Sequence, residues 1–354
     1  MRIAQLAPLA ECVPPKGYGG SELVVNLLTE ELIKRGHEVT LFATADSQTD
    51  GRLIECAPEG LRASEIAPTR WHAYNIKALI KLEEMQGEFD IIHNHMGYAA
   101  LPALSHFRTP VVTTNHNPLY DYCKDIYFAY GHMNFISISD AYKRLNYPDK
   151  VNYFATVYNG INLDDFEVNF DANKSDERKH LLFLGRLCAD KGTREAIEIA
   201  RKIGMPIVLA GKVDRNDEKY FNEFVKPMLS EPGVEFVGEV STAQKVSLYN
   251  SSVATLCPIN FEEPFGLVFS ESLACGTPVM AFRRGAAPEV ISDGETGVIG
   301  ESVDELVGRF SEIKNITPQV CRDRVQRLFS KEKMTDSYLK AFDTVLSKAL
   351  AGRR

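Results

Sequence analysis

The sequence lacks several features that would place it in a narrow class of proteins. It has no apolar run of 18 residues, and the apolar part of MRIAQLAPLAECVPP is too short for a signal peptide, so we expect neither a membrane-spanning helix nor export. It also lacks a C-x-x-C pair and any low-complexity tract. Its seven cysteines are odd in number and scattered, which predicts reduced core thiols in a cytoplasmic protein rather than disulfides or a metal framework.

A surplus of basic residues is also missing. Residues 1–160 hold 14 Lys and Arg against 18 Asp and Glu, the rest of the chain holds 26 against 30, and the net charge is −8. An evenly acidic chain is not typical of proteins that bind nucleic acid or anionic membranes. We therefore expect no nucleic-acid partner and at most weak membrane association.

The chain does contain two successive series of short apolar runs, which predict two α/β domains. At 354 residues it exceeds the usual span of one hydrophobic core. Strands are expected at 2–8, 38–43, 90–95, 110–114 and 135–139, and again at 181–185, 206–210, 234–238, 253–257 and 278–282. Residues 162–178 are polar and acidic, as linkers are, so the predicted domains are 1–165 and 166–332. Residues 47–70 are expected to form loops or an irregular hairpin, and 323–350 an amphipathic helix.

The stretch PINFEEPFGLVFSE, residues 258–271, is the most informative part of the sequence. Glu263 and Glu271 stand eight positions apart, on either side of Phe265, Gly266 and Leu267. Pro264 and Gly276 are start and stop signals for a helix, and the amides of residues 265–268 would lie at its beginning. Free amides at a helix start bind anions, whereas carboxylates bind polyols. The combination suggests a sugar-nucleotide ligand.

Other polar residues follow predicted strands, and each has an alternative explanation. Arg186 and Lys191 lie in the loop after a strand, where they could clamp a diphosphate or form a solvated surface pair. His93 and His95 share one face of a strand and could meet His116 in a metal site, but no acidic or thiol partner follows at ligand spacing. A hydrogen-bonded core position is favoured for His93, and a ligand contact for His116.

The loop from Lys16 to Glu22 is rich in glycine and joins a predicted strand to a helix. Gly19 and Gly20 would let backbone approach a phosphate or a sugar, although a plain turn would use the same residues. A dinucleotide fingerprint with Asp46 as the ribose ligand is disfavoured, because Glu22 occupies the position of the third glycine.

These motifs, taken in order, resemble the retaining glycosyltransferases of the GT-B fold, family 4 in particular. The resemblance rests on G-x-G-G-S-E at 17–22, D-I-I-H-x-H at 90–95, His116, N-G-I at 159–161, G-R-x-x-x-x-K-G at 185–192 and E-x-F-G-L-x-x-x-E at 263–271. It implies an α/β protein of two Rossmann-like domains whose parallel sheets face each other across a cleft. The N-terminal domain would bind the acceptor and the C-terminal domain the nucleotide-sugar donor, with a helix at about 333–354 crossing back to the first domain.

The resemblance also implies roles for single residues. Glu271 would bind the ribose, Glu263 would lie by the donor sugar, and the amides of Phe265, Gly266 and Leu267 would hold sugar hydroxyls and the distal phosphate. Arg186 and Lys191 would bind the diphosphate, and His116 would contact the donor sugar. Gly19 and Gly20 would approach the phosphates. The base would lie against the backbone near Gly211 and Val240. Two departures from the family pattern stand close by: Gly285-Ala286 replaces a pair of glycines, and Glu262 adds an acid beside Glu263.

The resulting hypothesis is the transfer of a hexose, with retention, from a nucleotide sugar such as UDP-glucose to a saccharide or lipid-linked saccharide acceptor. Because the sequence has no D-x-D motif, we expect no metal and no other cofactor, with cations and amides neutralising the departing diphosphate. Retention could involve a covalent Glu263 adduct or same-face attack, and the family pattern favours the latter. The alternatives are a nucleotide-sugar binding protein with degenerate catalysis and, less favoured, a dinucleotide-dependent oxidoreductase.

Overall fold

A computed structural model describes residues 1–17, 19–168 and 178–351 of the chain. The chain divides into two compact units: unit 1 is Met1–Gly160 with the segment that begins at Lys331, and unit 2 is Ile161–Ser330. The sequence hypothesis placed the boundary slightly later, after residue 165. Residues 169–177 of the expected linker lie outside the described residues.

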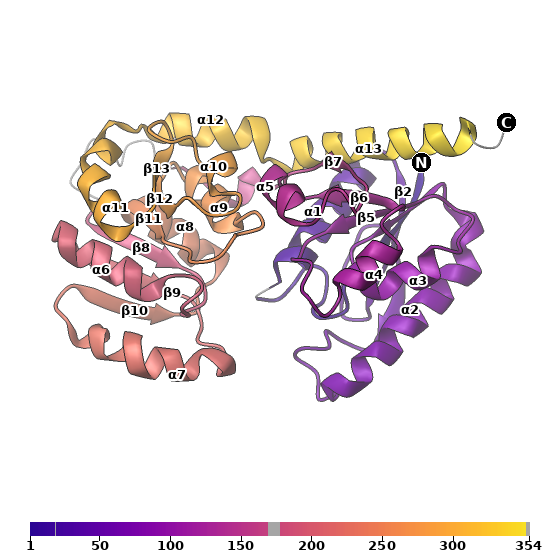
Figure 1. The fold of residues 1–354 in the computed structure, drawn as a ribbon, viewed down its shortest axis with the longest axis horizontal. Coiled ribbons are helices and arrows are strands. Elements are labelled where there is room, and N and C mark those ends of the chain that lie inside the picture. Colours follow the sequence, from indigo (N-terminus) through magenta and orange to yellow (C-terminus); the bar gives the residue numbers. More distant parts are fainter. Residues whose placement is uncertain (18, 169–177, 352–354) are drawn as a thin grey trace. The chain divides into compact units, whose positions relative to one another are not determined.

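Unit 1 is built on a parallel sheet (Figure 1) with the order β3-β2-β1-β4-β5-β6-β7 in the described residues. Its strands are β1 Arg2–Leu6, β2 Glu38–Thr44, β3 Arg52–Ala57, β4 Ile91–Asn94, β5 Val111–Asn115, β6 Asn134–Ser137 and β7 Tyr153–Thr156. Neighbouring residues along a strand pack into different hydrophobic clusters: Ile91 belongs to one cluster and Ile92 to another. A parallel strand covered on both faces needs such continuous apolar runs.

Helices cover this sheet on both faces. They are α1 Gly20–Lys34, α2 Trp71–Met85, α3 Leu101–Leu104, α4 Lys124–Ala129, α5 Asp140–Leu145 and α13 Lys331–Ala351. The last helix of the chain lies with this unit and contacts α1. Its buried residues Tyr338, Ala341, Phe342 and Val345 recur at helical spacing and join the cluster that contains Ile91. Burial of this stripe attaches α13 to unit 1.

Unit 2 repeats the plan with a second parallel sheet of order β10-β9-β8-β11-β12-β13 in the described residues. The strands are β8 His180–Leu184, β9 Ile207–Ala210, β10 Val234–Gly238, β11 Ser252–Cys257, β12 Val279–Phe282 and β13 Gly297–Gly300. The strand order reverses direction between β8 and β11. In open α/β sheets, ligands bind at the carboxyl ends of strands beside such a reversal.

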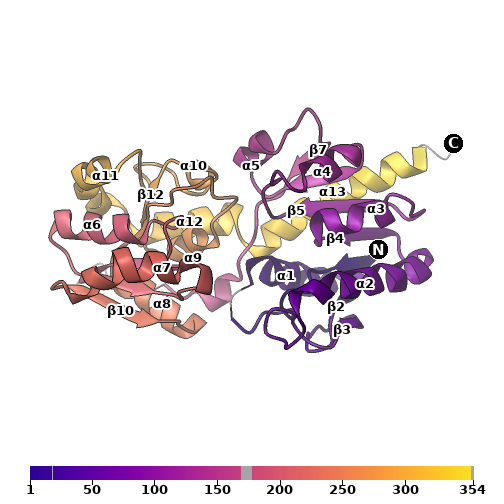
Figure 2. The ribbon, with the colours of Figure 1, turned by 60° about the horizontal axis from the view of Figure 1, so that its bottom comes forward.

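The helices of unit 2 carry clear start and stop signals. They are α6 Thr193–Ile203, α7 Glu218–Tyr220, α8 Thr242–Ser251, α9 Leu267–Ala274, α10 Ala287–Val290, α11 Val303–Arg309 and α12 Pro318–Leu328. α6 runs between two left-handed glycines, Gly192 and Gly204, and α8 begins with a capping box formed by Ser241 and Gln244. α6 packs against α11, and α9 against α12 (Figure 2).

The sequence predicted most of the strands and long helices, but not β3, β7, β13 or the short helices α3, α4, α5, α7 and α10. Residues 52–57 form β3, a regular strand paired with β2, and not a loop or an irregular hairpin. The expected helix over 323–350 is two helices, because Phe329 and Ser330 bond to Ile161 instead of continuing the helix. Residues 297–300, for which no element was predicted, form β13. No helix among the described residues is long and apolar enough to cross a membrane.

Candidate functional site

In unit 2 the loop after β8 packs tightly against the segment that follows β11. Gly192 has φ +74°, and a Cβ atom there would lie 1.9 Å from the carbonyl oxygen of Pro258. Only glycine tolerates this combination of conformation and contact. The close packing brings Lys191, one residue earlier, to the stretch that carries Glu263.

Lys191 and Glu263 form an ion pair at these strand ends. The Lys191 Nζ lies 2.5 Å from Glu263 Oε2, and it also lies 4.9 Å from the centre of the Phe261 ring. Their side chains are only 23% and 11% exposed, so water screens the attraction less than at an open surface. The pair fixes a cation and a carboxylate together at the carboxyl edge of the sheet.

Glu262 and Glu263 have different surroundings, although they are neighbours. The carboxylate of exposed Glu262 accepts a hydrogen bond of 2.5 Å from the Gly285 amide, whereas buried Glu263 holds Lys191. The Ala286 amide donates to the Glu263 carbonyl oxygen at 2.8 Å. A Cβ atom on Gly285, whose φ is +53°, would lie 2.2 Å from that same oxygen. The chain therefore needs glycine at 285 and accommodates alanine at 286.

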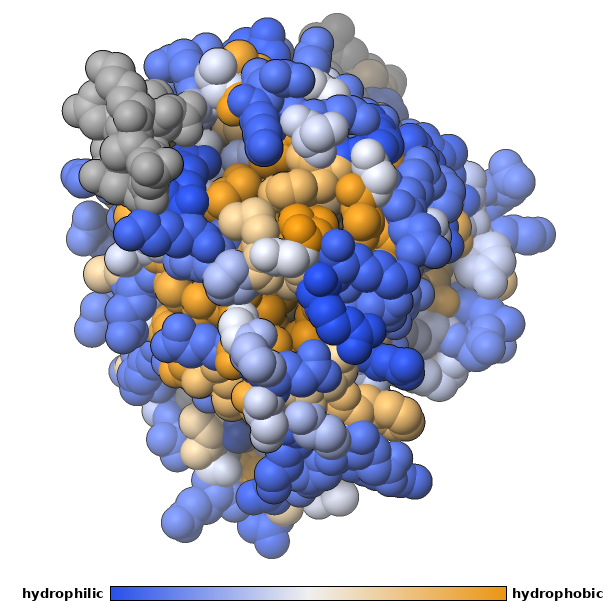
Figure 3. All heavy atoms as spheres, turned by 90° about the vertical axis from the view of Figure 1, so that its left-hand side faces the viewer, coloured by the Kyte–Doolittle hydropathy of each residue, from blue (hydrophilic) through white to orange (hydrophobic). Residues whose placement is uncertain are grey.

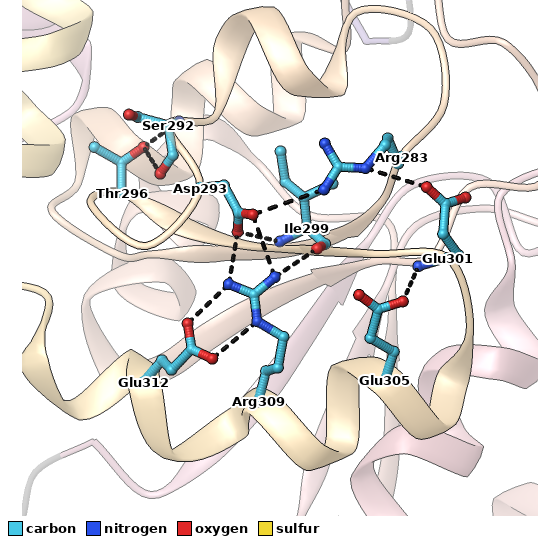
Figure 4. A network of polar contacts seen from close by, with 9 residues as sticks. All are labelled: Arg283, Ser292, Asp293, Thr296, Ile299, Glu301, Glu305, Arg309 and Glu312. Atoms are coloured by element: carbon cyan, nitrogen blue, oxygen red, sulfur yellow. Dashed lines mark hydrogen bonds and ion pairs between the residues drawn. The ribbon is translucent and has the colours of Figure 1, made fainter.

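A network of ion pairs anchors the segments on either side of α10, which follows this loop (Figure 4). Arg309 contacts Asp293 Oδ1 at 3.0 Å and Glu312 at 2.8 Å, and it donates to the Ile299 carbonyl oxygen at 2.8 Å. Arg283, which directly follows β12, contacts Glu301 at 3.1 Å. Burial alone would raise the pKa of Asp293, but the hydrogen bonds from Arg309 and the Ile299 amide leave that pKa lowered. These contacts hold the segments next to the loop at residues 283–289 in place.

Helix α9 begins at Leu267, directly after Gly266. Gly266 has φ +80°, and a Cβ atom there would lie 2.4 Å from the Phe269 ring. The amides of Leu267 and Val268 have no hydrogen-bond partner within the described part of the chain. The Phe265 ring packs against Phe329 in the core, with ring centres 5.7 Å apart. This turn therefore offers backbone donors, while its aromatic side chain holds it in place.

Glu271 lies on α9 and contacts two residues of α8. Its Oε2 accepts a hydrogen bond of 3.0 Å from the Tyr249 hydroxyl and lies 3.6 Å from Lys245 Nζ. Burial, together with the charge of Glu271, raises the pKa of Tyr249 well above its ordinary value, so the hydroxyl remains a donor. Both contacts use Oε2, which leaves Oε1 available to hydroxyl groups of a ligand.

The other residues predicted in unit 2 also lie at its carboxyl edge. Arg186 contacts Asp217 at 3.2 Å and Asp214 at 3.6 Å. Gly211 has φ +141° and a Cβ atom there would overlap the Gly185 carbonyl oxygen, so the two backbone segments touch. Val240 is half-buried, two residues beyond β10.

In unit 1, three histidines meet at the carboxyl ends of β4 and β5. His95 Nδ1 lies 2.8 Å from His116 Nε2, and His95 Nε2 lies 3.1 Å from His93 Nδ1. His93 is fully buried and bonds to Thr114 Oγ1 at 2.7 Å, which confirms the predicted core position. Burial lowers the pKa of His116 to about 4 and lowers the pKa values of His93 and His95 well below 6.5. All three rings are therefore neutral at pH 7.

The histidines are not arranged around a common point. His95 uses different ring nitrogens for its two neighbours, so the nitrogens bond to one another rather than converge on an ion. Among the described residues, no group of three His, Cys, Asp or Glu could hold a metal ion.

The glycine loop of unit 1 leads into α1. Gly19 precedes the helix with an extended φ of 163°, and a Cβ atom there would lie 2.7 Å from Pro15 Cβ. Gly20 is exposed as the first residue of α1. Glu22 is buried, which raises the pKa of its carboxyl group. Tyr18 lies outside the described residues.

Two shallow grooves lie elsewhere. One is lined by residues of β3 and α2, including Glu55, Tyr74 and Lys81. The other lies at the amino ends of β8, β9 and β10, away from the edge that carries Lys191. Figure 3 shows unit 2 from a side where hydrophobic residues form an area bordered by hydrophilic ones. None of the predicted site residues lines either groove.

Several contacts of the site were not foreseen from the sequence. Lys245 and Tyr249 stand four residues apart on α8, a spacing that places both on one helix face, and this was the available signal. The bonds of the histidines to Gln5 and Thr114, and of Thr114 to Tyr338, join residues far apart in the chain and have no local signature.

Comparison with known families covers both units. Residues 18–165 match the model of the family described as Glycosyltransferase Family 4, and residues 164–324 match that of Glycosyl transferases group 1.

Individual relatives agree with these matches. An uncharacterized glycosyltransferase of Methanocaldococcus jannaschii is 27% identical over 329 residues, covering 80% of this chain and 82% of that protein. The D-inositol 3-phosphate glycosyltransferase of Mycolicibacterium smegmatis is 25% identical over 362 residues, with coverage of 88% and 82%. Among solved structures, HepE of Anabaena in complex with UDP and glucose superimposes with a TM-score of 0.72 at 17% identity, covering 97% of this chain and all of that one.

Proposed function

From the premise that this chain belongs to the GT-B glycosyltransferases of family 4 type, we propose that it transfers a hexose from a UDP-linked donor to a saccharide acceptor with retention. The fold and the glycosyltransferase class follow from membership of this family. The finer proposal depends mainly on one observation, the ion pair between Lys191 and Glu263 beside the free amides that open α9.

The reaction requires stabilisation of the negative charge that leaves with the nucleoside diphosphate. Preorganised cations and amides stabilise such a charge most effectively in a site that excludes water. Lys191, partly buried and fixed by Glu263, provides a cation, and the amides of Leu267 and Val268 provide donors. Arg186 adds a second cation, which would exchange its contacts with Asp214 and Asp217 for phosphate oxygens. We propose that these groups replace a metal ion.

The nucleotide is proposed to bind through Glu271. Its Oε1 would accept hydrogen bonds from the ribose hydroxyls, while Tyr249 and Lys245 hold Oε2. The base would lie against the backbone near Gly211 and Val240, where the close packing of Gly185 and Gly211 leaves main chain at the edge of the sheet. Gly19 and Gly20 would approach the phosphates.

The donor sugar is proposed to lie by Glu263 and His116. The Glu263 carboxylate forms an ion pair with Lys191. This pairing favours an electrostatic role for Glu263 during same-face attack over the formation of a covalent adduct. His116 is neutral and suited to a hydrogen bond with a sugar hydroxyl. UDP and glucose are proposed because HepE, a protein of the same fold, was solved with both.

A transfer assay tests this proposal. The protein is incubated with UDP-glucose carrying ¹³C at the anomeric carbon, with GDP-mannose in parallel, and with a panel of saccharides that includes inositol 3-phosphate because one relative is named for it. NMR then follows UDP release and the anomeric configuration of the product. We expect an α-linked glucoside, unaffected by EDTA. A β-linked product would contradict retention, and loss of activity in EDTA that a divalent ion restores would contradict metal independence.

The second candidate is a nucleotide-sugar binding protein without turnover. Binding of UDP-glucose without release of UDP, with every acceptor and with water alone, would support this candidate. The ordered Lys191–Glu263 pair favours the enzyme, because binding alone does not require a cation fixed beside a buried carboxylate.

A further inference from the structure

An unbroken chain of buried hydrogen bonds leads from the last helix of the sequence to His116. The Thr114 hydroxyl donates to the Tyr338 hydroxyl at 3.2 Å, and His93 Nε2 lies 2.7 Å from Thr114 Oγ1. His93 Nδ1 then lies 3.1 Å from His95 Nε2, and His95 Nδ1 lies 2.8 Å from His116 Nε2. All five residues belong to unit 1.

The direction of this chain can be worked out from the Tyr338 end. Thr114 donates its only hydroxyl hydrogen to Tyr338, so it accepts a hydrogen bond from an N–H at His93 Nε2. A neutral imidazole carries one N–H, so His93 Nδ1 accepts from His95 Nε2. By the same rule His95 Nδ1 accepts, and the donor is His116 Nε2.

Gln5, as it is oriented in the structure, agrees with this direction. Its Oε1 lies 3.0 Å from His95 Nε2, and a carbonyl oxygen can only accept. In this orientation His95 Nε2 carries the hydrogen, which again leaves His95 Nδ1 as the acceptor for His116. A turn of the Gln5 amide by 180° would present Nε2, a buried donor without a partner in the described residues, so Gln5 can follow the direction that Thr114 sets.

Neutrality of the three rings is essential to this argument, because a protonated imidazole donates from both nitrogens. Burial lowers the pKa of His116 to about 4 and those of His93 and His95 well below 6.5. No carboxylate is among the hydrogen-bond partners of the three rings in the described residues.

One nitrogen of the His116 ring has no hydrogen-bond partner among the described residues. Within the described part of the chain, His95 is the only hydrogen-bond partner of the His116 ring. His116 is 9% exposed, and Nδ1 is the ring nitrogen that remains for a ligand.

We propose that the chain from Tyr338 through Thr114, His93 and His95 locks His116 in the Nε2–H tautomer, so that His116 Nδ1 accepts a hydrogen bond from a hydroxyl of the donor sugar. Thr114 and Tyr338 are positioning residues, which act on the sugar through His116. The tautomer is a property of the protein alone, whereas its use with a sugar rests on the proposed function.

The tautomer is tested by NMR of protein labelled with ¹⁵N in its histidine rings. Long-range ¹H–¹⁵N correlation spectra distinguish a protonated from an unprotonated Nδ1, and the His116→Asn variant assigns the signals. We expect His116 to show a protonated Nε2 and an unprotonated Nδ1 at pH 7. The Nδ1–H tautomer, or an even mixture of the two, would overturn the proposal.

Substitutions test the contribution of the chain. Thr114→Val removes the hydroxyl and keeps the shape, so the His116 signals should shift toward a mixture of tautomers. Thr114→Ser retains the hydroxyl and should restore the wild-type pattern. Tyr153→Phe is the matched control, because it removes a buried hydroxyl that bonds to Asn115 at 2.8 Å and not to the histidines. A His116 tautomer that Thr114→Val leaves unchanged would contradict control by the chain.

Kinetics with monodeoxy analogues of UDP-glucose test the contact with the sugar. One analogue should lower kcat/KM relative to UDP-glucose in wild type but not in His116→Ala, and the hydroxyl that it lacks is the one that His116 binds. Thr114→Val should lower kcat/KM for intact UDP-glucose about five- to tenfold, the worth of one hydrogen bond, and should have no effect with that analogue. Equal losses with both donors would overturn the positioning role. If wild-type protein releases no UDP at all, the proposed function fails, while the NMR result on the tautomer still stands.

Discussion

The carboxyl edges of the two sheets are built from different chemistry. In unit 2, charged side chains form the pairs Lys191–Glu263 and Lys245–Glu271. In unit 1, the corresponding edge carries neutral histidines bonded to one another and to hydroxyl and amide groups. A similar α/β plan thus supports a charged site and an uncharged one.

This difference matches the two kinds of group in a nucleotide sugar. Fixed charges and amides suit a diphosphate and hold the ribose, while neutral donors and acceptors with defined direction suit sugar hydroxyls. The predictions that follow change one edge at a time, from the largest expected effect to the smallest.

Lys191→Ala should have the largest effect. It removes the cation proposed to neutralise the leaving diphosphate and leaves the Glu263 carboxylate without its partner. We expect kcat/KM for transfer to fall on the order of 10²- to 10³-fold, with the fold retained by circular dichroism. Lys202→Ala removes a lysine paired at the surface with Asp304 and Glu198, and serves as the control. Near-normal turnover in Lys191→Ala would reject the assignment.

The adjacent acids should differ sharply. Glu263→Gln removes the charge that holds Lys191 and should lower kcat roughly a hundredfold, comparable to the loss of one transition-state contact. Glu262→Gln keeps an oxygen that can accept from the Gly285 amide, so kcat should change less than about threefold. Steady-state kinetics of both variants check this, and equal losses would mean that Glu263 has no special role.

Glu271→Gln should act mainly on donor binding. Loss of a carboxylate that accepts from the ribose should raise the KM for the donor roughly tenfold or more, with a smaller change in kcat. Tyr249→Phe removes the hydrogen bond to Oε2 and should produce a weaker version of the same change. A fall in kcat alone, with donor KM unchanged, would place Glu271 elsewhere in the reaction.

The uncharged edge predicts the smallest effect, a loss of stability in mild acid. The pKa of His116 is about 4 in the folded protein and about 6.5 when unfolded, so between these values the unfolded state binds more protons. The free energy of unfolding should therefore fall as pH drops from about 6.5 to about 4, by at most about 1.4 kcal/mol per pH unit for this histidine. Urea unfolding of His116→Gln should show a shallower fall, whereas His132→Gln, which changes an exposed residue, should match wild type.

Much of this description could be predicted from the sequence. Strand ends followed by polar residues located Lys191, His116 and Glu263 at sheet edges, because parallel strands direct their carboxyl ends the same way. The turn before α9 was predictable too: Gly266 directly precedes the helix, and Glu271 lies little more than one turn into it.

Contacts between distant segments could not be predicted. The Lys191–Glu263 pair joins residues 72 positions apart and depends on the packing of Gly192 against Pro258. The break at Phe329 and Ser330 was missed because apolar spacing continues through it, and only their bonds with Ile161 end the helix. Tyr338 reads as a core residue of an amphipathic helix, and nothing local indicates that its hydroxyl meets Thr114.

The most direct test of the division between a charged and an uncharged edge is the binding of donors in EDTA. Calorimetry with wild type and with Lys191→Ala, using UDP-glucose, GDP-mannose and NADH in turn, measures it. The account predicts that wild type binds UDP-glucose and does not bind NADH, and that Lys191→Ala weakens the binding of UDP-glucose at least tenfold. Binding of NADH without UDP-glucose, or equal affinity of both proteins for UDP-glucose, would contradict it.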